Sequence, residues 1–345
     1  MNDSPESLLA LWPNYKPTPL HDLTDLAAKL GIGSLIIKNE GERPLGSFKS
    51  LGGMYACLRA LARQAGISTI AELVATGPHK DLPPLVCASD GNHGLAVAAG
   101  AKLAGAPARV YLPAIVPQSR ADRILKEGGE VLRIDGTYED AVQAAAHAAR
   151  MGEGILIADT TDQPNDPAVT DVMSGYSIMA RELRDVLDAG NMAAPTHIFL
   201  QAGVGGFAAA IADGLGQHLA SPAKIIIVEP ESAACVKAAL AAGRVVRFAG
   251  SLDTSAEMLS CGEASAPALV RLQAHNVEAM TVSEAGLLEA VQMLHAEGGL
   301  ATTPSGATGF AGLLTAIAND ELRTQYALAP ASRVLLFATE GPVPA

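Results

Sequence analysis

Short apolar segments alternate with longer amphipathic segments along most of the chain. The apolar runs are bounded by turn-forming residues and are typical of buried strands, whereas the longer segments carry apolar residues at helical spacing. The predicted strands are 35–38, 85–88, 108–112, 130–134, 155–158, 197–200, 224–229 and 333–338. Helices predicted between them include 48–65, 93–103, 116–127, 138–151 and 168–187. This alternation predicts an α/β protein with largely parallel sheets flanked by helices.

The length of the chain predicts two domains. The sequence has 345 residues, which exceeds the roughly 250–300 residues at which a single hydrophobic core stops growing. Turn formers gather at 155–170, where Asp159, Pro164, Asn165 and Pro167 favour a crossing between lobes. We expect a smaller domain over 46–164 and a larger one built from 1–45 and 165–345.

Charge and cysteine content exclude several classes of partner. Asp and Glu number 36 against 24 Lys and Arg, a net charge of −12 that disfavours binding to nucleic acid or anionic membranes. The four cysteines form no CxxC pair and no zinc-type spacing, so no metal site is predicted, and the N-terminus lacks a basic stretch before an apolar core. We therefore expect a cytoplasmic protein.

One uncharged stretch, 191–212, raises the question of a membrane span. Glycines interrupt it directly after a β-rich run at 197–200, which favours a buried strand, a tight turn and a helix. No membrane association is predicted.

A lysine stands at the start of a predicted helix in the segment Gly-Ser-Phe-Lys-Ser at 46–50. The positive end of the helix dipole disfavours an ammonium there, so in a dry site the pKa of Lys49 would be lowered. A neutral lysine attacks carbonyl groups. The alternative is a solvated surface lysine.

Polar residues follow the strand predicted at 85–88, in the segment Ser89, Asp90, Gly91, Asn92 and His93. Glycines bracket the Asn and His, which favours a backbone that approaches a ligand closely in a crevice at the carboxyl end of a strand. An Asp-Gly turn that caps a helix is an equally good interpretation.

Glycines also follow the strand predicted at 197–200, in the segment Gly203, Val204, Gly205 and Gly206. Exposed N–H groups at the start of a helix can bind a phosphate even in an acidic protein. The spacing is neither GxGxxG nor the Walker pattern, which disfavours nicotinamide dehydrogenases and nucleotide hydrolases. A glycine turn needed only for packing is the alternative.

Together these motifs resemble the pyridoxal-phosphate enzymes of fold type II, the tryptophan synthase β-subunit superfamily, and within it the diaminopropionate ammonia-lyase branch. The resemblance runs in order through Pro-Thr-Pro-Leu at 17–20, Lys-Asn-Glu at 38–40, Ser-Phe-Lys at 47–49, Ser-Asp-Gly-Asn-His-Gly at 89–94, the glycine loop at 201–207, Val-Glu-Pro at 228–230, Ser-Cys-Gly-Glu at 260–263, Pro-Ser-Gly at 304–306 and Thr-Glu-Gly at 339–341. Ser-Phe-Lys and the glycine loop are shared with threonine dehydratases and serine racemases. Asp90 and the Cys-Gly-Glu segment point to the ammonia-lyase branch.

The resemblance implies a role for each of these segments. Lys49 would bind pyridoxal 5'-phosphate covalently, Asn92 would contact its ring oxygen, the loop 203–206 would hold its phosphate, and Thr339 would lie beside its ring nitrogen. Ser89, Asp90 and His93 would bind the substrate, with Asp90 also exchanging a proton with it. The larger domain would bind the cofactor, the smaller domain would lie on the substrate side, and the enzyme would be a homodimer.

The implied function is a lyase that eliminates ammonia from 2,3-diaminopropionate or a related β-substituted amino acid and yields pyruvate or another keto acid. A serine or threonine dehydratase and a β-replacement synthase are alternatives within the superfamily. A cofactor-bearing protein without turnover is an alternative of a different class.

Overall fold

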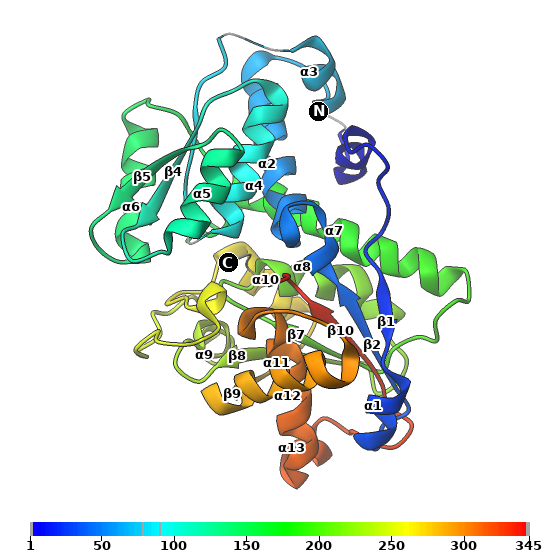
Figure 1. Cartoon of the computed structure of the whole chain (residues 1–345). Coiled ribbons are helices and arrows are strands. Elements are labelled where there is room, and N and C mark those ends of the chain that lie inside the picture. The colour runs from blue at the N-terminus through cyan, green and yellow to red at the C-terminus, as the bar shows by residue number, and fades with distance from the viewer. Residues whose placement is uncertain (1–2, 78, 80, 90, 343–345) are drawn as a thin grey trace.

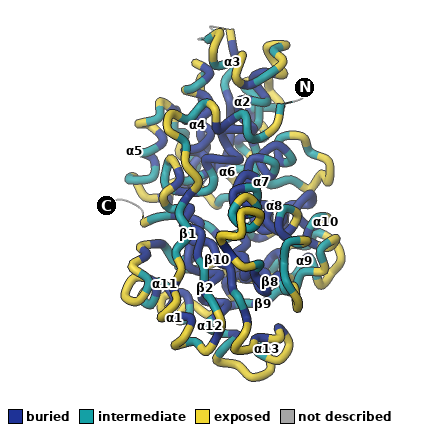
Figure 2. The backbone as a smooth tube through the Cα atoms, turned by 90° about the vertical axis from the view of Figure 1, so that its right-hand side faces the viewer, coloured by how far each residue is buried: buried dark blue, intermediate teal, exposed yellow. Residues whose placement is uncertain are grey.

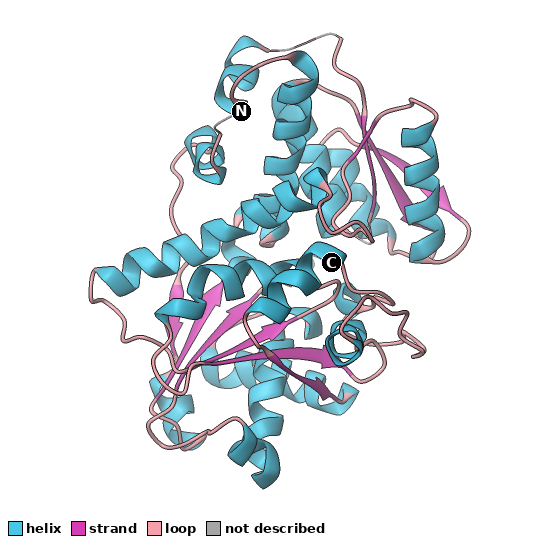
Figure 3. Cartoon of the chain, turned by 180° about the vertical axis from the view of Figure 1, so that it is seen from behind, coloured by secondary structure: helices cyan, strands magenta, loops and turns pink. Residues whose placement is uncertain are grey.

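The molecule consists of two lobes, each built around its own β-sheet (Figure 1, Figure 3). This computed structural model describes residues 3–77, 79, 81–89 and 91–342. The large lobe contains a six-stranded sheet, and the small lobe contains a four-stranded sheet. The predicted α/β class, with a fold of parallel sheets flanked by helices, is confirmed.

The large sheet has the strand order β1-β2-β10-β7-β8-β9, and only β1 runs antiparallel to its neighbour. Its strands are β1 (Leu20–Asp22), β2 (Ser34–Asn39), β7 (His197–Gln201), β8 (Lys224–Pro230), β9 (Glu278–Val282) and β10 (Arg333–Ala338). The small sheet is parallel throughout, in the order β5-β4-β3-β6. Its strands are β3 (Leu85–Ala88), β4 (Ala108–Pro113), β5 (Glu130–Ile134) and β6 (Ile155–Leu156).

Helices cover both sheets. They are α1 (Thr24–Lys29), α2 (Lys49–Ala65), α3 (Ile70–Thr76), α4 (Asn92–Ala104), α5 (Gln118–Lys126), α6 (Tyr138–Arg150), α7 (Pro167–Asp188), α8 (Gly206–Leu215), α9 (Cys235–Ala242), α10 (Ala266–Ala274), α11 (Glu284–Gly298), α12 (Pro304–Ala318) and α13 (Asp320–Gln325). The long α7 runs between the two lobes (Figure 1). No helix formed by the described residues is both long enough and apolar enough to cross a membrane.

The central strands read as continuous apolar runs because both of their faces are buried. In β7, Ile198 and Leu200 pack into one hydrophobic core while Phe199 packs into another on the opposite face. The first core also includes residues of α2, α4, α7 and α8, so it continues from the large sheet to the small one. The tube in Figure 2 shows this buried interior through both lobes. The lobes are therefore joined by apolar packing.

All eight predicted strands are confirmed with boundaries close to those of the structure. The prediction for 191–212 is also confirmed, since β7 and α8 form a strand, a tight turn and a helix there. Two strands, β1 and β9, were not predicted. The first has three residues at the sheet edge, and the second alternates between half-buried and buried positions, so neither carries a continuous apolar run.

Candidate active site

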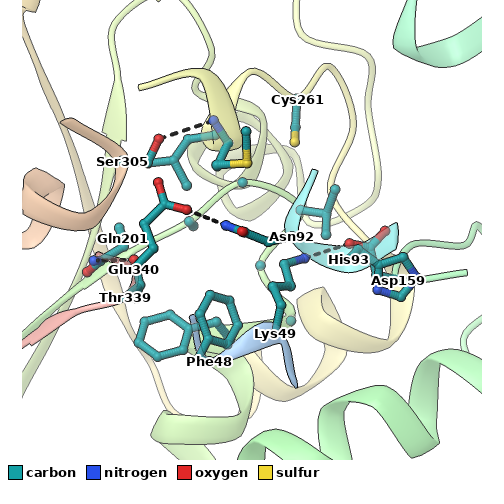
Figure 4. Close-up of a pocket in the computed structure, with 18 of the residues that line it drawn as sticks. Phe48, Lys49, Asn92, His93, Asp159, Gln201, Cys261, Ser305, Thr339 and Glu340 are labelled. Carbon is teal, nitrogen blue, oxygen red and sulfur yellow. Dashed lines mark hydrogen bonds and ion pairs between the residues drawn. The ribbon is translucent and has the colours of Figure 1, made fainter. Parts of the chain in front are cut away.

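The segments singled out from the sequence meet in one pocket between the lobes (Figure 4). It lies beyond the carboxyl ends of β3, β6, β7 and β10, where open parallel sheets usually bind ligands. The predicted residues that line it are Lys49, Ser89, Asn92, His93, Gly203, Val204, Gly205, Gly206 and Thr339. Asp90 lies outside the described residues.

Lys49 is the first residue of α2, and contacts with three distant segments fix its position. The Phe48 N–H donates to the Thr339 carbonyl at 3.2 Å, and the Gly341 N–H donates to the Gly46 carbonyl at 3.0 Å. The Phe48 ring packs against Tyr176, with ring centroids 4.8 Å apart, and against Phe207 at 5.0 Å. The lysine therefore starts from an anchored backbone beside the end of β10.

The Lys49 amine is paired with a carboxylate that the sequence analysis did not assign to the site. Its Nζ lies 2.6 Å from Oδ2 of Asp159, just beyond β6. Burial by itself lowers the pKa of Lys49, but the Asp159 charge outweighs it and raises that pKa above its ordinary value. The expectation of a lowered lysine pKa is therefore wrong for this arrangement, because the sequence did not reveal the counter-charge.

Asp159 is ionised in this pair. Burial by itself would raise its pKa, but the charge of Lys49 and the hydrogen bond from its amine hold the pKa of the carboxyl well below its usual range. The Tyr138 hydroxyl lies 3.5 Å from its Oδ1. Asp159 follows a predicted strand, so the rule that led to Ser89 and Gly203 could have found it. The sequence analysis above treats Asp159 only as a turn former.

Ser89 and His93 have clear local contacts. The Ser89 hydroxyl oxygen accepts the N–H groups of Gly91 at 2.9 Å and Gly94 at 2.8 Å, which shapes the turn into α4. The Nε2 of His93 is 2.8 Å from the Ile157 carbonyl and must donate to it, since a carbonyl only accepts. Burial lowers the pKa of His93, so the ring is neutral, and its Nδ1 has no hydrogen-bond partner among the described residues.

Asn92 contacts a second carboxylate that we had noted without a role. Its Nδ2 donates to Glu340, which also accepts from the Thr303 hydroxyl (Figure 4 shows the contact with Asn92). Burial raises the pKa of Glu340, while the hydrogen bonds from Thr303 and Asn92 act in the opposite direction. Glu340 thus links the start of α4 in the small lobe to the start of α12 in the large lobe.

The glycine loop offers backbone donors at the start of α8. Gly205 adopts φ 96°, the left-handed region that favours glycine, and no side chain caps the helix. The first N–H groups of a helix have no partner within the helix, and here residues 203–206 line the pocket. Among the described residues that line the pocket, Lys49 is the only lysine or arginine. A phosphate here would be bound mainly by backbone groups and the helix dipole.

These features fit pyridoxal phosphate. The pocket combines a lysine amine, an uncapped helix start after glycines, and the Thr339 hydroxyl at the end of the last strand. Within the described part of the chain, no three His, Cys, Asp or Glu side chains are grouped as metal ligands.

Fold and site together define an enzyme of the pyridoxal-phosphate-dependent class with the fold type II architecture. A family model described as "Pyridoxal-phosphate dependent enzyme" matches residues 11–340, and the chain belongs to this family.

Proteins whose sequences are similar to this chain include diaminopropionate ammonia-lyases. That of Salmonella typhimurium is 37% identical over 262 residues, which span 73% of this chain and 65% of the relative. This chain therefore matches slightly less than two thirds of that relative's length. The L-threonine dehydratase of Haemophilus influenzae is 33% identical over 227 residues, which span 66% of this chain and 38% of the relative.

Solved structures with a similar fold support the family assignment. The holo diaminopropionate ammonia-lyase of Escherichia coli superposes with a TM-score of 0.87 at 28% identity, over 98% of this chain and 88% of that one. The same enzyme has been solved with an aminoacrylate-PLP azomethine reaction intermediate and with D-serine.

Proposed function

We propose that the protein eliminates ammonia from 2,3-diaminopropionate or a related β-substituted amino acid. With diaminopropionate and one water molecule, the products are pyruvate and two molecules of ammonia. The observation that carries this proposal is the half-buried Lys49–Asp159 pair, which lines one pocket together with an uncapped helix start. The similarity to diaminopropionate ammonia-lyases supports the choice of substrate.

Four parts of the pocket would hold the cofactor. Lys49 binds it covalently, the N–H groups of 203–206 bind its phosphate, Asn92 contacts its ring oxygen and Thr339 contacts its ring nitrogen. When bound, pyridoxal phosphate supplies an electron sink that makes the α-proton of an amino acid removable.

Lys49 is the base in this proposal. While Lys49 holds the cofactor its nitrogen cannot act as a base, so the α-amino group of the substrate would first have to replace it there and release the lysine as a free amine. The free amine then removes the α-proton and returns it later, as expected of a general acid–base group at this position.

Carboxylates act on the leaving group. An amine is a poor leaving group unless it is protonated, and a carboxylate holds an amino group in its charged form. Asp159 is ionised at the pocket and suits this role. We also assign Asp90 to the substrate, either as the group that holds the β-amino group or as a base on the face opposite Lys49. Ser89 and His93 complete the substrate side.

The proposed roles of the site residues correspond to a division of the chain into two domains. We propose that 46–164 form the substrate-side domain and that 1–45 and 165–345 form the cofactor-binding domain. The positions of the strands support it, since the small sheet uses strands between Leu85 and Leu156 and the large sheet uses the others.

We further propose a cytoplasmic homodimer. All four cysteines are free thiols, which supports a reducing compartment. Light scattering should give twice the mass of the chain, and a monomer would contradict the dimer.

A substrate panel tests the function. Purified protein should release pyruvate and ammonia from one or both isomers of diaminopropionate faster than it releases keto acid from serine or threonine. The second candidate, a dehydratase, is favoured by the threonine dehydratase similarity and predicts the reverse order. Incorporation of sulfide into O-acetylserine would identify a β-replacement synthase, and bound cofactor without any turnover would identify a binding protein.

Borohydride reduction tests the cofactor link. The reduced cofactor should map to Lys49, and Lys49→Ala should lose the adduct. Lys102→Ala, which changes a lysine with a 59% exposed side chain, serves as the control and should keep it. Mapping to another lysine would overturn the assignment.

A further inference from the structure

Tyr176 is a buried residue of the pocket to which the proposed function gives no role. It belongs to α7, the helix that runs between the lobes, and is 2% exposed. Its hydroxyl has no hydrogen-bond partner among the described residues. A buried hydroxyl without a partner is unfavourable, so a ligand that supplies the partner would be bound more tightly.

The ring of Tyr176 lies where the starts of two helices meet. It packs edge-on against Phe48, which precedes α2, with ring centroids 4.8 Å apart. A Cβ at Gly52 in α2 would lie only 2.4 Å from the ring, so this glycine makes room for it. A Cβ at Gly206, the first residue of α8, would lie 3.8 Å from the same ring, which is ordinary van der Waals contact. Tyr176 is therefore fixed beside the glycine loop.

The hydroxyl keeps its hydrogen at neutral pH. Burial raises the pKa of Tyr176 to about 12, although the charge of Lys49 acts in the opposite direction. Lys49 affects this hydroxyl more than any other charged group does, but a protonated amine has no lone pair and cannot accept the hydrogen. Within the described part of the chain, Tyr176 is a hydrogen-bond donor without an acceptor.

Gln201 is another buried polar residue of the pocket and shows the contrast. Its amide nitrogen lies 3.0 Å from the Gly306 carbonyl and 2.9 Å from the Phe337 carbonyl. Both hydrogens of that amide are therefore used within the protein. The hydrogen of the Tyr176 hydroxyl is left for a ligand.

The chemistry of pyridoxal phosphate indicates which atom would meet this hydrogen. On the pyridine ring, the carbon that Lys49 would hold lies between the ring oxygen and the arm that carries the phosphate. Asn92 is assigned to the ring oxygen, and Thr339 is assigned to the ring nitrogen. Tyr176 instead lies beside the loop 203–206, which is assigned to the phosphate. The phosphate is therefore the acceptor group on the side of Tyr176.

We propose that the Tyr176 hydroxyl donates a hydrogen bond to the phosphate of pyridoxal phosphate and so adds a side-chain donor to the backbone donors of the glycine loop. Among the described residues that line the pocket, Lys49 is the only lysine or arginine, so a neutral donor takes a place that a cation could have filled. The inference rests on the proposed function, because it uses the cofactor contacts proposed for Lys49 and the glycine loop.

A comparison of two forms of the cofactor tests the proposal. Tyr176→Phe keeps the ring and removes only the hydroxyl. The dissociation constant of pyridoxal phosphate should rise about 10- to 100-fold, the usual effect of losing a hydrogen bond to a charged group. The affinity for pyridoxal, which has no phosphate, should stay the same. The absorbance of the bound cofactor measures both affinities.

Tyr55→Phe is the matched control. Tyr55 is also buried, but its hydroxyl donates to the Asp3 carbonyl at 2.7 Å. This variant should keep both affinities and lower the thermal midpoint of the cofactor-free protein. Tyr176→Phe should not lower that midpoint, because the hydroxyl that it removes has no partner. These opposite outcomes separate a ligand contact from a structural role.

Phosphorus NMR of the holoenzyme provides a second readout. The signal of the bound phosphate should move in Tyr176→Phe and stay in place in Tyr55→Phe. If Tyr176→Phe does not fold, 3-fluorotyrosine in place of Tyr176 keeps the hydroxyl and serves as the probe. Its fluorine signal should then move more when pyridoxal phosphate binds than when pyridoxal binds.

An equal loss of affinity for pyridoxal phosphate and pyridoxal would overturn the phosphate contact and leave the lyase proposal intact, and so would an unchanged affinity for pyridoxal phosphate. Equal fluorine shifts with the two ligands would have the same meaning. Failure of the wild-type protein to bind pyridoxal phosphate would overturn the inference together with the proposed function.

Discussion

Two lysines form carboxylate pairs of nearly the same length, one fully buried and one partly exposed. Lys38 Nζ lies 2.5 Å from Glu182, and their side chains are 1% and 2% exposed. Lys49 Nζ lies 2.6 Å from Asp159, and their side chains are 22% and 12% exposed. The distances alone do not distinguish the two pairs.

The two ion pairs differ in how many other groups each carboxylate contacts. Glu182 also binds Arg43 and accepts from the Tyr15 hydroxyl, and Arg43 in turn binds Glu40. Two positive and two negative charges are therefore enclosed together, each held by more than one contact. Asp159 and Lys49 both line the pocket, so a ligand bound there would meet this pair. We infer that the first set of charges fixes the fold and the second is kept available for chemistry.

Breaking the enclosed set should have the largest effect on stability. Glu182→Gln keeps the shape and leaves Lys38 and Arg43 with one carboxylate, so the free energy of unfolding should fall by about 3–5 kcal/mol. Urea unfolding measures it. Glu127→Gln, which breaks the surface pair with Lys102, is the control and should cost no more than about 1 kcal/mol. Equal losses in the two variants would remove the distinction.

Breaking the pocket pair should affect activity more than stability. Asp159→Asn removes the charge beside Lys49, and kcat/KM on the preferred substrate should fall by about 10²–10⁴-fold, as for loss of a proton-transfer group. Its free energy of unfolding should change less than that of Glu182→Gln, because solvent reaches the pocket. A variant that unfolds readily but retains turnover would reverse the comparison.

Acid should weaken both pairs. The pKa values of Asp159 and Glu182 are lowered in the folded protein because the charges of their partners outweigh burial. The unfolded chain therefore takes up more protons below about pH 4, and the free energy of unfolding falls as the pH decreases. In cofactor-free protein, thermal midpoints between pH 3 and 6 should decline less steeply for Asp159→Asn than for the wild type. Parallel curves would show that the pair contributes nothing to acid stability.

The smallest effect is expected at the edge of the enclosed set. Tyr15→Phe removes the hydroxyl that donates to Glu182 and leaves the ion pairs in place. The free energy of unfolding should fall by about 1 kcal/mol, the usual net value of a hydrogen bond. A loss as large as that of Glu182→Gln would mean that Tyr15 is essential to the set.

The sequence predicted the segments of the site better than the contacts within it. Each strand end was recognisable locally, because an apolar run followed by glycine or polar residues has a direct structural meaning. The partner of Lys49 is 110 positions away, and the partners of Gln201 are more than 100 positions away. The strand-end rule could have marked Asp159 as a site residue, but no local pattern encodes such pairings, so the contacts of Asp159, Gln201 and Glu340 needed the fold before they could be described.

The central place of β10 in the large sheet governs when the pocket can exist. This strand lies between β2 and β7, and the segment after it holds Gly46 and Phe48 in place. During synthesis β2 and β7 leave the ribosome before β10, so neither can be joined to the other until β10 appears. The segment that carries Lys49 also needs the residues after β10, because Gly46 and Phe48 form hydrogen bonds with them. Nascent chains released before β10 would thus lack the pocket as a whole, and the enzyme's chemistry is withheld until β10 has been made.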